Sequence, residues 1–373
     1  MKRRIELTID KMVAKGEALA RHEGKAIFIP GAIPGERLLV ELTEERRDFS
    51  RAKIVEILEA SKERITPRCP YYGRCGGCDF QFVDNSSQVA FKEAIVLENL
   101  ERIGKIDTSK IEFKGSVVKE EWGYRNRVRF HTQGNKVGFL ARQSKTLVPI
   151  DHCLVLCDQL NLYLGEKRGE VLKQKGGSVH ALAGDSEVTF SRRPVALTVG
   201  EKTLYCDAKA FFQSNYLILP ELVNYVKEAV VGEKVLDLYS GVGTFAAFLE
   251  GQGREVIAVE RDRRCLELAK RNLKETQFVP LPLEMWVKGG DLPQVDTIVV
   301  DPPRVGLERE VLNILTTLGA STIVYVSCDS VTLSRDLKLF ATKGYHTTTL
   351  KLFDMYPQTS HIEAVVLMSK IEK

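Results

Sequence analysis

The sequence lacks a hydrophobic run long enough to span a membrane, and it carries little net charge. No segment approaches the ~20 apolar residues of a transmembrane helix, and residues 1–10 alternate polar and apolar side chains instead of forming the apolar stretch of a signal peptide. We therefore expect a cytoplasmic protein with no membrane association. A net charge of +4 over 373 residues permits nucleic-acid binding, but only a local basic surface could provide the attraction.

Internal repeats and low-complexity segments are also absent, and the composition is that of an ordinary globular protein. The length predicts two or three domains, which we place at residues 1–58, 59–208 and 209–373. The first has short strands at residues 4–9, 25–29, 38–42 and 52–58, separated by Gly and Pro turns, and so reads as a small β-barrel. Such a barrel is either purely structural or binds nucleic acid.

The last region alternates strand and helix patterns. Apolar runs predict strands at residues 234–238, 255–260, 297–301 and 322–327, and the helical stretches between them imply a doubly wound parallel sheet. Two more strand-like runs, at residues 346–353 and 363–368, predict an antiparallel hairpin at one edge of that sheet. The fold class is therefore a multi-domain α/β protein, with an N-terminal β-barrel, a central α+β domain and a C-terminal Rossmann-like domain.

The central region contains the most basic segment of the chain. The region begins with a cysteine cluster, and a helix at residues 88–102 and a hairpin at residues 125–132 and 136–142 follow. Residues 119–145 hold seven Lys or Arg against two Glu, with aromatic residues interleaved. Arg125, Arg127 and Arg129 would share one strand face, which either contacts RNA phosphates or is simply solvated.

A glycine-containing loop follows the first strand of the C-terminal region. Gly241 and Gly243 allow the backbone to approach a ligand closely, and Glu260 ends the next strand, where a carboxylate usually holds ribose hydroxyls. The three-glycine dinucleotide fingerprint is absent, which disfavours a nicotinamide cofactor. The loop indicates a nucleotide-like cofactor of another kind.

Cys328 directly follows the predicted strand at residues 322–327. It therefore lies at the carboxyl end of the parallel strands, where α/β proteins bind their ligands. Asp301 ends another apolar run, and Glu363 lies in the tail. A thiol in this position is either a buried structural residue or a nucleophile that adds to an electrophilic ring.

The spacing of the other cysteines predicts a metal site. Cys69, Cys75 and Cys78 are separated by six and three positions, and Cys153 or Cys157 is available as a fourth ligand. Four thiolates suit a [4Fe-4S] cluster or a zinc ion. Radical enzymes that cleave S-adenosylmethionine commonly use a different cysteine spacing.

Several stretches together resemble the RNA (uracil-5-)-methyltransferases: residues 211–215 (FFQSN), 237–245 (DLYSGVGTF), 301–304 (DPPR), 327–337 (SCDSVTLSRDL) and 357–363 (PQTSHIE). The barrel is similar to a TRAM domain and the cysteine cluster to the family's iron–sulfur site, a combination that resembles the branch acting on 23S ribosomal RNA. The resemblance implies S-adenosyl-L-methionine as methyl donor, ribosomal RNA as partner and no obligate protein partner.

The resemblance also implies a role for individual residues. Cys328 would be the nucleophile and Glu363 the base, with Cys69, Cys75, Cys78 and Cys153 as cluster ligands. Phe211 would lie near a flipped base, whereas Arg125, Arg127 and Arg129 are predicted to contact RNA from the basic segment alone. The residues that would line the methyl donor are Gln213, Tyr239, Gly241, Gly243, Thr244, Glu260 and Asp301. Methylation of transfer RNA, cytosine-5 methylation and a catalytically silent RNA-binding protein are the alternatives.

Overall fold

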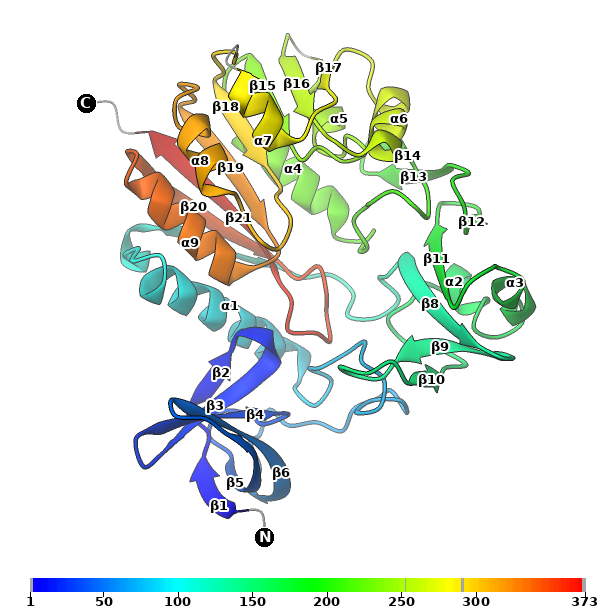
Figure 1. The fold of residues 1–373 in the computed structure, drawn as a ribbon, viewed down its shortest axis with the longest axis vertical. Helices are drawn as coiled ribbons and strands as arrows, with labels where there is room; N and C mark the ends of the chain where they lie inside the picture. Colours follow the sequence, from blue (N-terminus) through cyan, green and yellow to red (C-terminus); the bar gives the residue numbers. More distant parts are fainter. Residues whose placement is uncertain (1–2, 252, 290–291, 371–373) are drawn as a thin grey trace. The chain divides into compact units, whose positions relative to one another are not determined.

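The computed structural model describes residues 3–251, 253–289 and 292–370 (Figure 1). The chain divides into two compact units. The first comprises Met1–Val96, Phe139–Val148 and Tyr356–His361, and the second comprises Leu97–Gly138, Pro149–Met355 and Ile362–Lys373. The three-domain division expected from the sequence remains a prediction.

The first unit contains a six-stranded sheet with the order β1-β5-β6-β4-β3-β2. Its strands are β1 (Arg4–Thr8), β2 (Lys11–Val13), β3 (Glu17–His22), β4 (Lys25–Pro30), β5 (Arg37–Glu45) and β6 (Phe49–Glu59). The four strands expected from the sequence are present, and β2 and β3 are additional. Ala18, Ile29, Leu38 and Val40 are buried on one side of this sheet in a single apolar core, as the alternation of polar and apolar residues along the strands requires.

The second unit is built on an eight-stranded sheet with the order β17-β16-β15-β18-β19-β21-β20-β7. Its strands are β7 (Glu112–Val117), β15 (Lys234–Leu238), β16 (Glu255–Val259), β17 (Gln277–Val279), β18 (Thr297–Val300), β19 (Thr322–Ser327), β20 (Tyr345–Phe353) and β21 (Glu363–Lys370). Strands β15 to β19 pair in parallel, whereas β21 is antiparallel to both β19 and β20. The predicted hairpin is present, but its expected position at an edge is wrong, because β7 pairs beyond β20.

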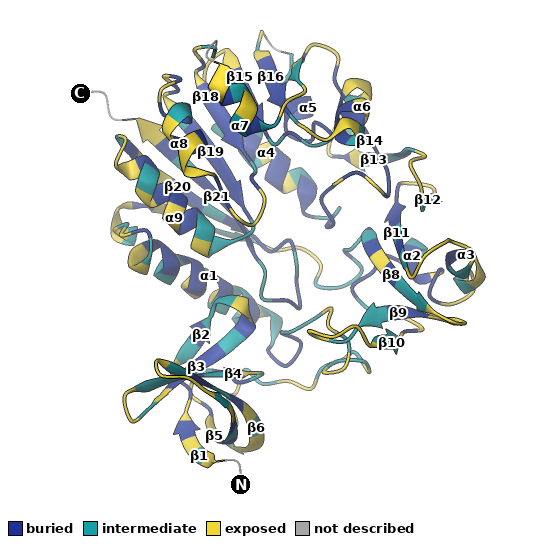
Figure 2. Ribbon diagram, viewed as in Figure 1, coloured by how far each residue is buried: buried dark blue, intermediate teal, exposed yellow. Residues whose placement is uncertain are grey.

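The central strands of this sheet are buried on both faces, as Figure 2 shows for β15, β18 and β19. That burial explains their continuous Val, Ile and Leu runs, since a parallel strand covered on both sides has no polar face. The helices are α1 (Asn85–Arg102), α2 (Asp158–Asn161), α3 (Arg168–Leu172), α4 (Leu219–Ala229), α5 (Ala246–Leu249), α6 (Arg263–Asn272), α7 (Leu283–Trp286), α8 (Arg309–Leu315) and α9 (Ser330–Ala341). No helix among the described residues is long and apolar enough to cross a membrane.

Two smaller sheets complete the strands. One has the order β10-β9-β8-β11-β12 and the other pairs β13 with β14. Their bounds are β8 (Arg127–Gln133), β9 (Lys136–Leu140), β10 (Leu147–Pro149), β11 (Ser178–Ala183), β12 (Val188–Thr189), β13 (Val195–Val199) and β14 (Lys202–Cys206). The predicted basic hairpin is β8 and β9, paired between residues 131–133 and 136–138. Its first strand begins two residues later than expected, so Arg125 lies before it.

Candidate active site

Several predicted site residues lie at the carboxyl ends of the parallel strands β15, β16, β18 and β19, which are neighbours in the large sheet (Figure 1). At this site, "edge" means the carboxyl end of the sheet. Leu238, the last residue of β15, pairs with Val259 of β16 and with Val300 of β18. Tyr239, Glu260 and Asp301 follow directly, and Cys328 follows β19 in the same way. This edge is where open α/β sheets bind their ligands.

Glu363 reaches the same edge because β21 runs in the opposite direction. Ser327 at the end of β19 pairs with Ala364 near the start of β21. The residue after Ser327 and the residue before Ala364 are Cys328 and Glu363, so the register places them opposite each other. A single reversed strand thus joins a thiol and a carboxyl group that are far apart in sequence.

The helix after the thiol is fixed at its first residue. The Asp329 side chain accepts hydrogen bonds from the backbone N–H groups of Val331 and Thr332, both at 3.0 Å. This is an N-cap, and it starts α9 immediately after Cys328. The strand end and the helix start therefore hold the Cys328 backbone between two rigid elements.

Cys328 lies in an acidic environment that one arginine partly offsets. Burial, followed by the charges of Glu363 and Asp301, raises the pKa of the Cys328 thiol to about 12, and Arg304 acts in the opposite direction. Burial also raises the pKa of Asp301 to about 7. Glu363 is 3% exposed, and burial together with the charge of Asp301 raises its pKa well above the usual range, while Arg304 lowers it.

The raised pKa values of Cys328, Asp301 and Glu363 mean that these three neighbouring groups do not all ionise together. Carboxyl groups that are buried and repel one another bind a proton more readily than exposed ones, and one of them can pass a proton on or accept one as its neighbours change charge. The free thiol is protonated at neutral pH, so its activation requires a base. Raised pKa values on a thiol and two carboxyl groups at a ligand-binding edge are typical of a catalytic site.

The loop after β15 has the backbone of a cofactor cradle. Gly241 and Gly243 have φ values of 57° and 81°, and Tyr239 has a φ of 60°, which is uncommon for a residue with a side chain. A Cβ on Gly243 would lie 2.7 Å from Leu273 Cδ1, so Leu273 would have to move, and a side chain would also be strained at this positive φ. The Glu260 carboxylate accepts the Gly241 N–H at 2.9 Å and holds the loop against the end of β16.

Two buried polar atoms beside this loop lack hydrogen-bond partners among the described residues. They are Ser240 Oγ and Asp237 Oδ1, while Asp237 Oδ2 accepts the Ala246 N–H at 3.0 Å. Burial raises the pKa of Asp237 to about 8. Buried polar groups are normally paired, so these two atoms fit a loop that completes its hydrogen bonds around a polar ligand. Thr244, in the same loop, is also buried.

The stretch before α4 connects this edge to a predicted RNA-contacting surface. Gln213 is buried, and its Nε2 donates to Asp301 Oδ2 at 3.4 Å. Phe211 is 60% exposed, which is unusual for a large apolar side chain, and the Arg127 guanidinium lies 5.9 Å from its ring centroid. An exposed ring held beside a cation is suited to stacking on an unpaired base.

The three arginines differ in their surroundings. Arg127 Nη2 donates to the Ala210 carbonyl at 2.9 Å, and Arg129 Nε donates to Ser178 Oγ at 2.6 Å. Arg125 does not share their strand face, because it precedes β8. Its backbone N–H bonds the Val155 carbonyl and its Nε bonds the Arg127 carbonyl. The predicted single face therefore contains only Arg127 and Arg129.

The cysteines of the predicted metal site lie in both units, and none of the eight cysteines, all of which the structure describes, is in a disulfide. Cys69, Cys75 and Cys78 belong to the first unit and Cys153 to the second. The charge of Cys69 contributes to raising the pKa of Cys75, after burial. A Cβ on Gly76 would lie 3.0 Å from the Leu140 carbonyl oxygen, so the loop is tightly wrapped.

The donor chemistry of these thiols fits a thiolate-bound cluster. In the described part of the chain, however, no group of three His, Cys, Asp or Glu side chains is arranged to hold a metal ion. The Cys153 backbone is fixed by Asn161, whose Oδ1 accepts its N–H at 2.8 Å. Ligation by these four residues remains a prediction.

Comparison with known structures first defines the class of protein. The fold matches the crystal structure of the Pyrococcus abyssi tRNA (uracil-54, C5)-methyltransferase in complex with S-adenosyl-L-homocysteine. The TM-score is 0.77 and the identity 23%, over 97% of this chain and 100% of that one. The fold is therefore that of a multi-domain methyltransferase with a Rossmann-like sheet.

Sequence comparison then gives the family. A TRAM domain model matches residues 3–55, and the tRNA (Uracil-5-)-methyltransferase model matches residues 288–371. An "uncharacterized RNA methyltransferase" of Thermotoga maritima is 32% identical over 98% of this chain and 99% of its own length. The 23S rRNA (uracil(1939)-C(5))-methyltransferase RlmD of Shewanella sediminis is 30% identical over 98% and 95%. The chain belongs to the RNA uracil-5 methyltransferase family, with an N-terminal TRAM domain.

Sequence reasoning gave no role to Arg304, Asp237 or Ser240. Arg304 stands in the Asp-Pro-Pro-Arg stretch after β18, and its charge acts on both Cys328 and Glu363. The Asp-Pro-Pro-Arg motif could have indicated this role for Arg304, because a basic residue three positions after Asp301 lies at the same carboxyl end of the sheet. For the unpaired atoms of Asp237 and Ser240 the sequence holds no signal, because pairing depends on tertiary packing.

Proposed function

We propose that this protein methylates carbon 5 of a specific uridine in 23S ribosomal RNA through a transient covalent bond between Cys328 and carbon 6 of the base. The observation that carries the proposal is the pairing of β19 with β21, which sets Cys328 opposite Glu363. The RlmD relative supports ribosomal RNA as the substrate. The same chemistry on a transfer RNA uridine, or on cytosine, is the alternative.

The methyl donor would be S-adenosyl-L-methionine, which supplies an electrophilic methyl group when bound. The loop from Tyr239 to Thr244, with Glu260 on the neighbouring strand, would hold its nucleoside part. Gln213 and Asp301, which bond each other, would orient its amino-acid part or the uracil edge. The unpaired atoms of Ser240 and Asp237 would gain partners when this site is filled.

Cys328 performs the first chemical step. Its thiol loses a proton to Asp301, the second carboxyl group that acts on this sulfur, and regains it when the sulfur later leaves. The sulfur adds to carbon 6 of uracil, which places negative charge on the ring and makes carbon 5 nucleophilic. Arg304 favours the thiolate because its positive charge lowers the pKa of Cys328. After carbon 5 has taken the methyl group, it still carries its original proton.

Glu363 completes the reaction by removing that proton. The electron pair of the C5–H bond then restores the double bond to carbon 6, and the sulfur of Cys328 leaves as a thiolate. The raised pKa of Glu363 makes its carboxylate form a stronger base than an exposed carboxylate, which favours transfer of the C5 proton to it. The target base must also leave its stack to reach both groups, so RNA binds with this uridine flipped or in a single-stranded loop.

The remaining predicted groups serve RNA binding. We propose that Cys69, Cys75, Cys78 and Cys153 hold a [4Fe-4S] cluster with a structural role, because methyl transfer to uracil consumes no electrons. The TRAM domain, Phe211, Arg127 and Arg129 would contact RNA. Reduced thiols and such a cluster fit the cytoplasm.

Two variants test the mechanism on in-vitro transcripts of 23S ribosomal RNA and transfer RNA. Cys328→Ala should abolish methyl transfer without changing the thermal midpoint substantially, because a partly exposed sulfur is lost. Glu363→Gln should transfer the methyl group but retain the RNA, giving an adduct that survives denaturing electrophoresis. Retained turnover in the first variant, or free protein with unmodified RNA in the second, would contradict the assigned roles. Methylation of transfer RNA alone would overturn the proposed substrate.

A further inference from the structure

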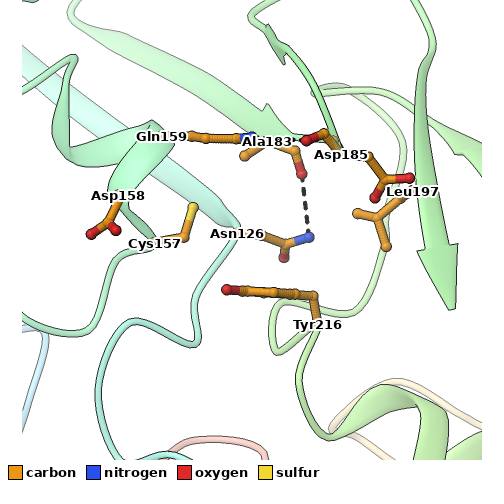
Figure 3. A pocket seen from close by; sticks show the side chains of 9 residues that line it. Asn126, Cys157, Asp158, Gln159, Ala183, Asp185, Leu197 and Tyr216 are labelled. Atoms are coloured by element: carbon orange, nitrogen blue, oxygen red, sulfur yellow. Dashed lines mark hydrogen bonds between the residues drawn. The ribbon is translucent and has the colours of Figure 1, made fainter. Parts of the chain in front are cut away.

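A cavity of about 390 Å³ lies in the same unit as the active-site residues (Figure 3). Its walls are formed by the residue before β8, by the start of α2 and the residue before it, by the end of β11 and the two residues after it, by β13 and by the stretch before α4. Tyr216 is part of that last stretch, three residues after Gln213. Three residues span at most about 11 Å, so Tyr216 lies within that Cα distance of a residue that bonds Asp301.

The cavity contains a buried acceptor that has no partner. Asn126 is 2% exposed, and its Oδ1 has no hydrogen bond among the described residues. Its Nδ2 donates to the Ala183 carbonyl at 3.4 Å, and Figure 3 shows the side chain between Ala183 and Tyr216. An unpaired buried carbonyl is unfavourable, so its position in a cavity wall indicates a ligand that donates a hydrogen bond.

The other polar groups of the wall restrict the chemistry of that ligand. Asp158 and Asp185 are both exposed, and the Asp185 carboxylate already accepts hydrogen bonds from the Thr198 N–H at 3.0 Å and from Thr198 Oγ1 at 2.7 Å. None of the described residues that form the wall is Lys, Arg or His. The negative charge of two carboxylates without a cation repels phosphate and disfavours a ligand that presents only acceptors, whereas it favours a neutral ligand that donates hydrogen bonds.

Tyr216 adds an aromatic surface. Its side chain is only partly buried, and its neighbour Leu197 is buried in the cavity wall. A flat, half-covered ring beside an apolar side chain stacks on a nucleobase without sequence preference. The sequence preference then comes from Asn126 and the two carboxylates.

We propose that this cavity binds one unstacked nucleobase that carries an exocyclic amino group (cytosine, adenine or guanine) from the RNA segment next to the target uridine. This inference rests on the proposed function as an RNA methyltransferase. The amino group donates to Asn126 Oδ1, the buried acceptor without a partner among the described residues. Uracil is disfavoured because two carbonyl oxygens flank its N–H, and the negative charges of Asp158 and Asp185 in the wall repel those oxygens.

Binding of short fluorescent oligoribonucleotides to the full chain, measured by anisotropy, tests the proposal. The probes are an oligouridylate and the same sequence with one cytidine, adenosine or guanosine at each position in turn. A further set replaces each of these nucleosides with the analogue that lacks its amino group. We expect about tenfold tighter binding for at least one substituted position, and no gain with the corresponding analogue. Tyr216→Ala and Asn126→Leu should both lose this preference.

Two matched variants separate the cavity from general RNA affinity and from folding. Tyr216→Phe keeps the ring and should keep the preference. Arg129→Ala should weaken binding of all probes equally, because a phosphate contact carries no base information. If Asn126→Leu does not fold, comparison of Tyr216→Ala with Tyr216→Phe still tests whether the cavity causes the base preference.

Equal binding of all probes by the wild-type protein, or an unchanged preference in Tyr216→Ala, overturns the nucleobase site. Tighter binding of an arginine-rich peptide at this cavity than of any RNA probe would also overturn it. Methyl transfer by the wild-type protein to the 23S transcript is measured in parallel. Transfer without a base preference removes only this inference, whereas a preference without transfer removes the proposed function and leaves the cavity as an RNA site.

Discussion

The charge balance around Cys328 predicts the reactivity of its thiol in the free protein. With a pKa of about 12, only roughly one thiol in ten thousand is ionised at pH 8, compared with about a quarter of ordinary thiols, because each pKa unit is a factor of ten. Alkylation proceeds through the thiolate. The rate of reaction of Cys328 with iodoacetamide should therefore rise about tenfold per pH unit between about pH 7 and 9.

Replacing Arg304 should slow this reaction further. A cation within a few ångströms lowers the pKa of an acid by about 1–3 units, and Arg304 is exposed, so water screens it and the lower limit applies. Arg304→Gln should therefore react about tenfold more slowly than the wild-type protein at the same pH. Arg309→Gln, which removes another exposed cation at the start of α8, is the matched control and should react at the wild-type rate.

Mass spectrometry of the peptide that contains Cys328 measures the rate without interference from the other seven cysteines. The difference between Arg304→Gln and the wild type should shrink in about 1 M salt, where charges are screened beyond roughly 3 Å. A rate that does not change with pH would refute the reasoning, because the thiol would then already be ionised. Equal rates for the two proteins would show that Arg304 does not act on this sulfur.

Three further outcomes are expected. Cys75→Ser should lose bound iron and visible absorbance in anaerobically purified protein, while Cys265→Ser, at a buried cysteine outside the predicted cluster, should retain both; iron retained by the first variant would remove Cys75 as a ligand. Asp237 has a folded-state pKa of about 8, above its unfolded value, so the folded state binds a proton more tightly and its stability falls as pH rises from about 4 to 8. Asp237→Asn should flatten this dependence of stability on pH. If the curves of thermal midpoint against pH for the variant and the wild type are parallel, the assignment is contradicted. Arg129→Ala should reduce the slope of log affinity for RNA against log salt concentration by about one, and an unchanged slope would mean that Arg129 contacts no phosphate.

The central parallel strands are the part of the fold that the sequence predicts best. Lys234–Leu238 and Thr322–Ser327 match their predicted bounds, because strands buried on both faces are continuous apolar runs with clear ends. Lys11–Val13 was missed because three residues are too few to establish a period. Glu112–Val117 was missed because it is an exposed edge strand containing a glycine, and it pairs with a strand far along the chain.

The sequence predicts the position of an active-site residue where that residue directly follows a recognisable strand. Cys328, Asp301 and Glu260 follow strands that the sequence reveals, and their common edge follows from parallel pairing. That Glu363 stands opposite Cys328 depends on the place of β21 between β19 and β20, which no local pattern specifies. The sequence wrongly placed Arg125 on the same strand face as Arg127 and Arg129. The alternation of faces holds only within a strand, and β8 begins at Arg127.

The reversed strand also has a consequence for the timing of reactivity. In a chain in which β21 has not yet paired with β19, the sulfur at the end of β19 would lack Glu363 at its side, because Glu363 begins β21. Pairing of β21 therefore both joins β20 to the parallel strands and completes the groups needed to release the product. A half-folded molecule could neither release a trapped nucleic acid nor complete a turnover, so structural maturation and catalytic competence are acquired together.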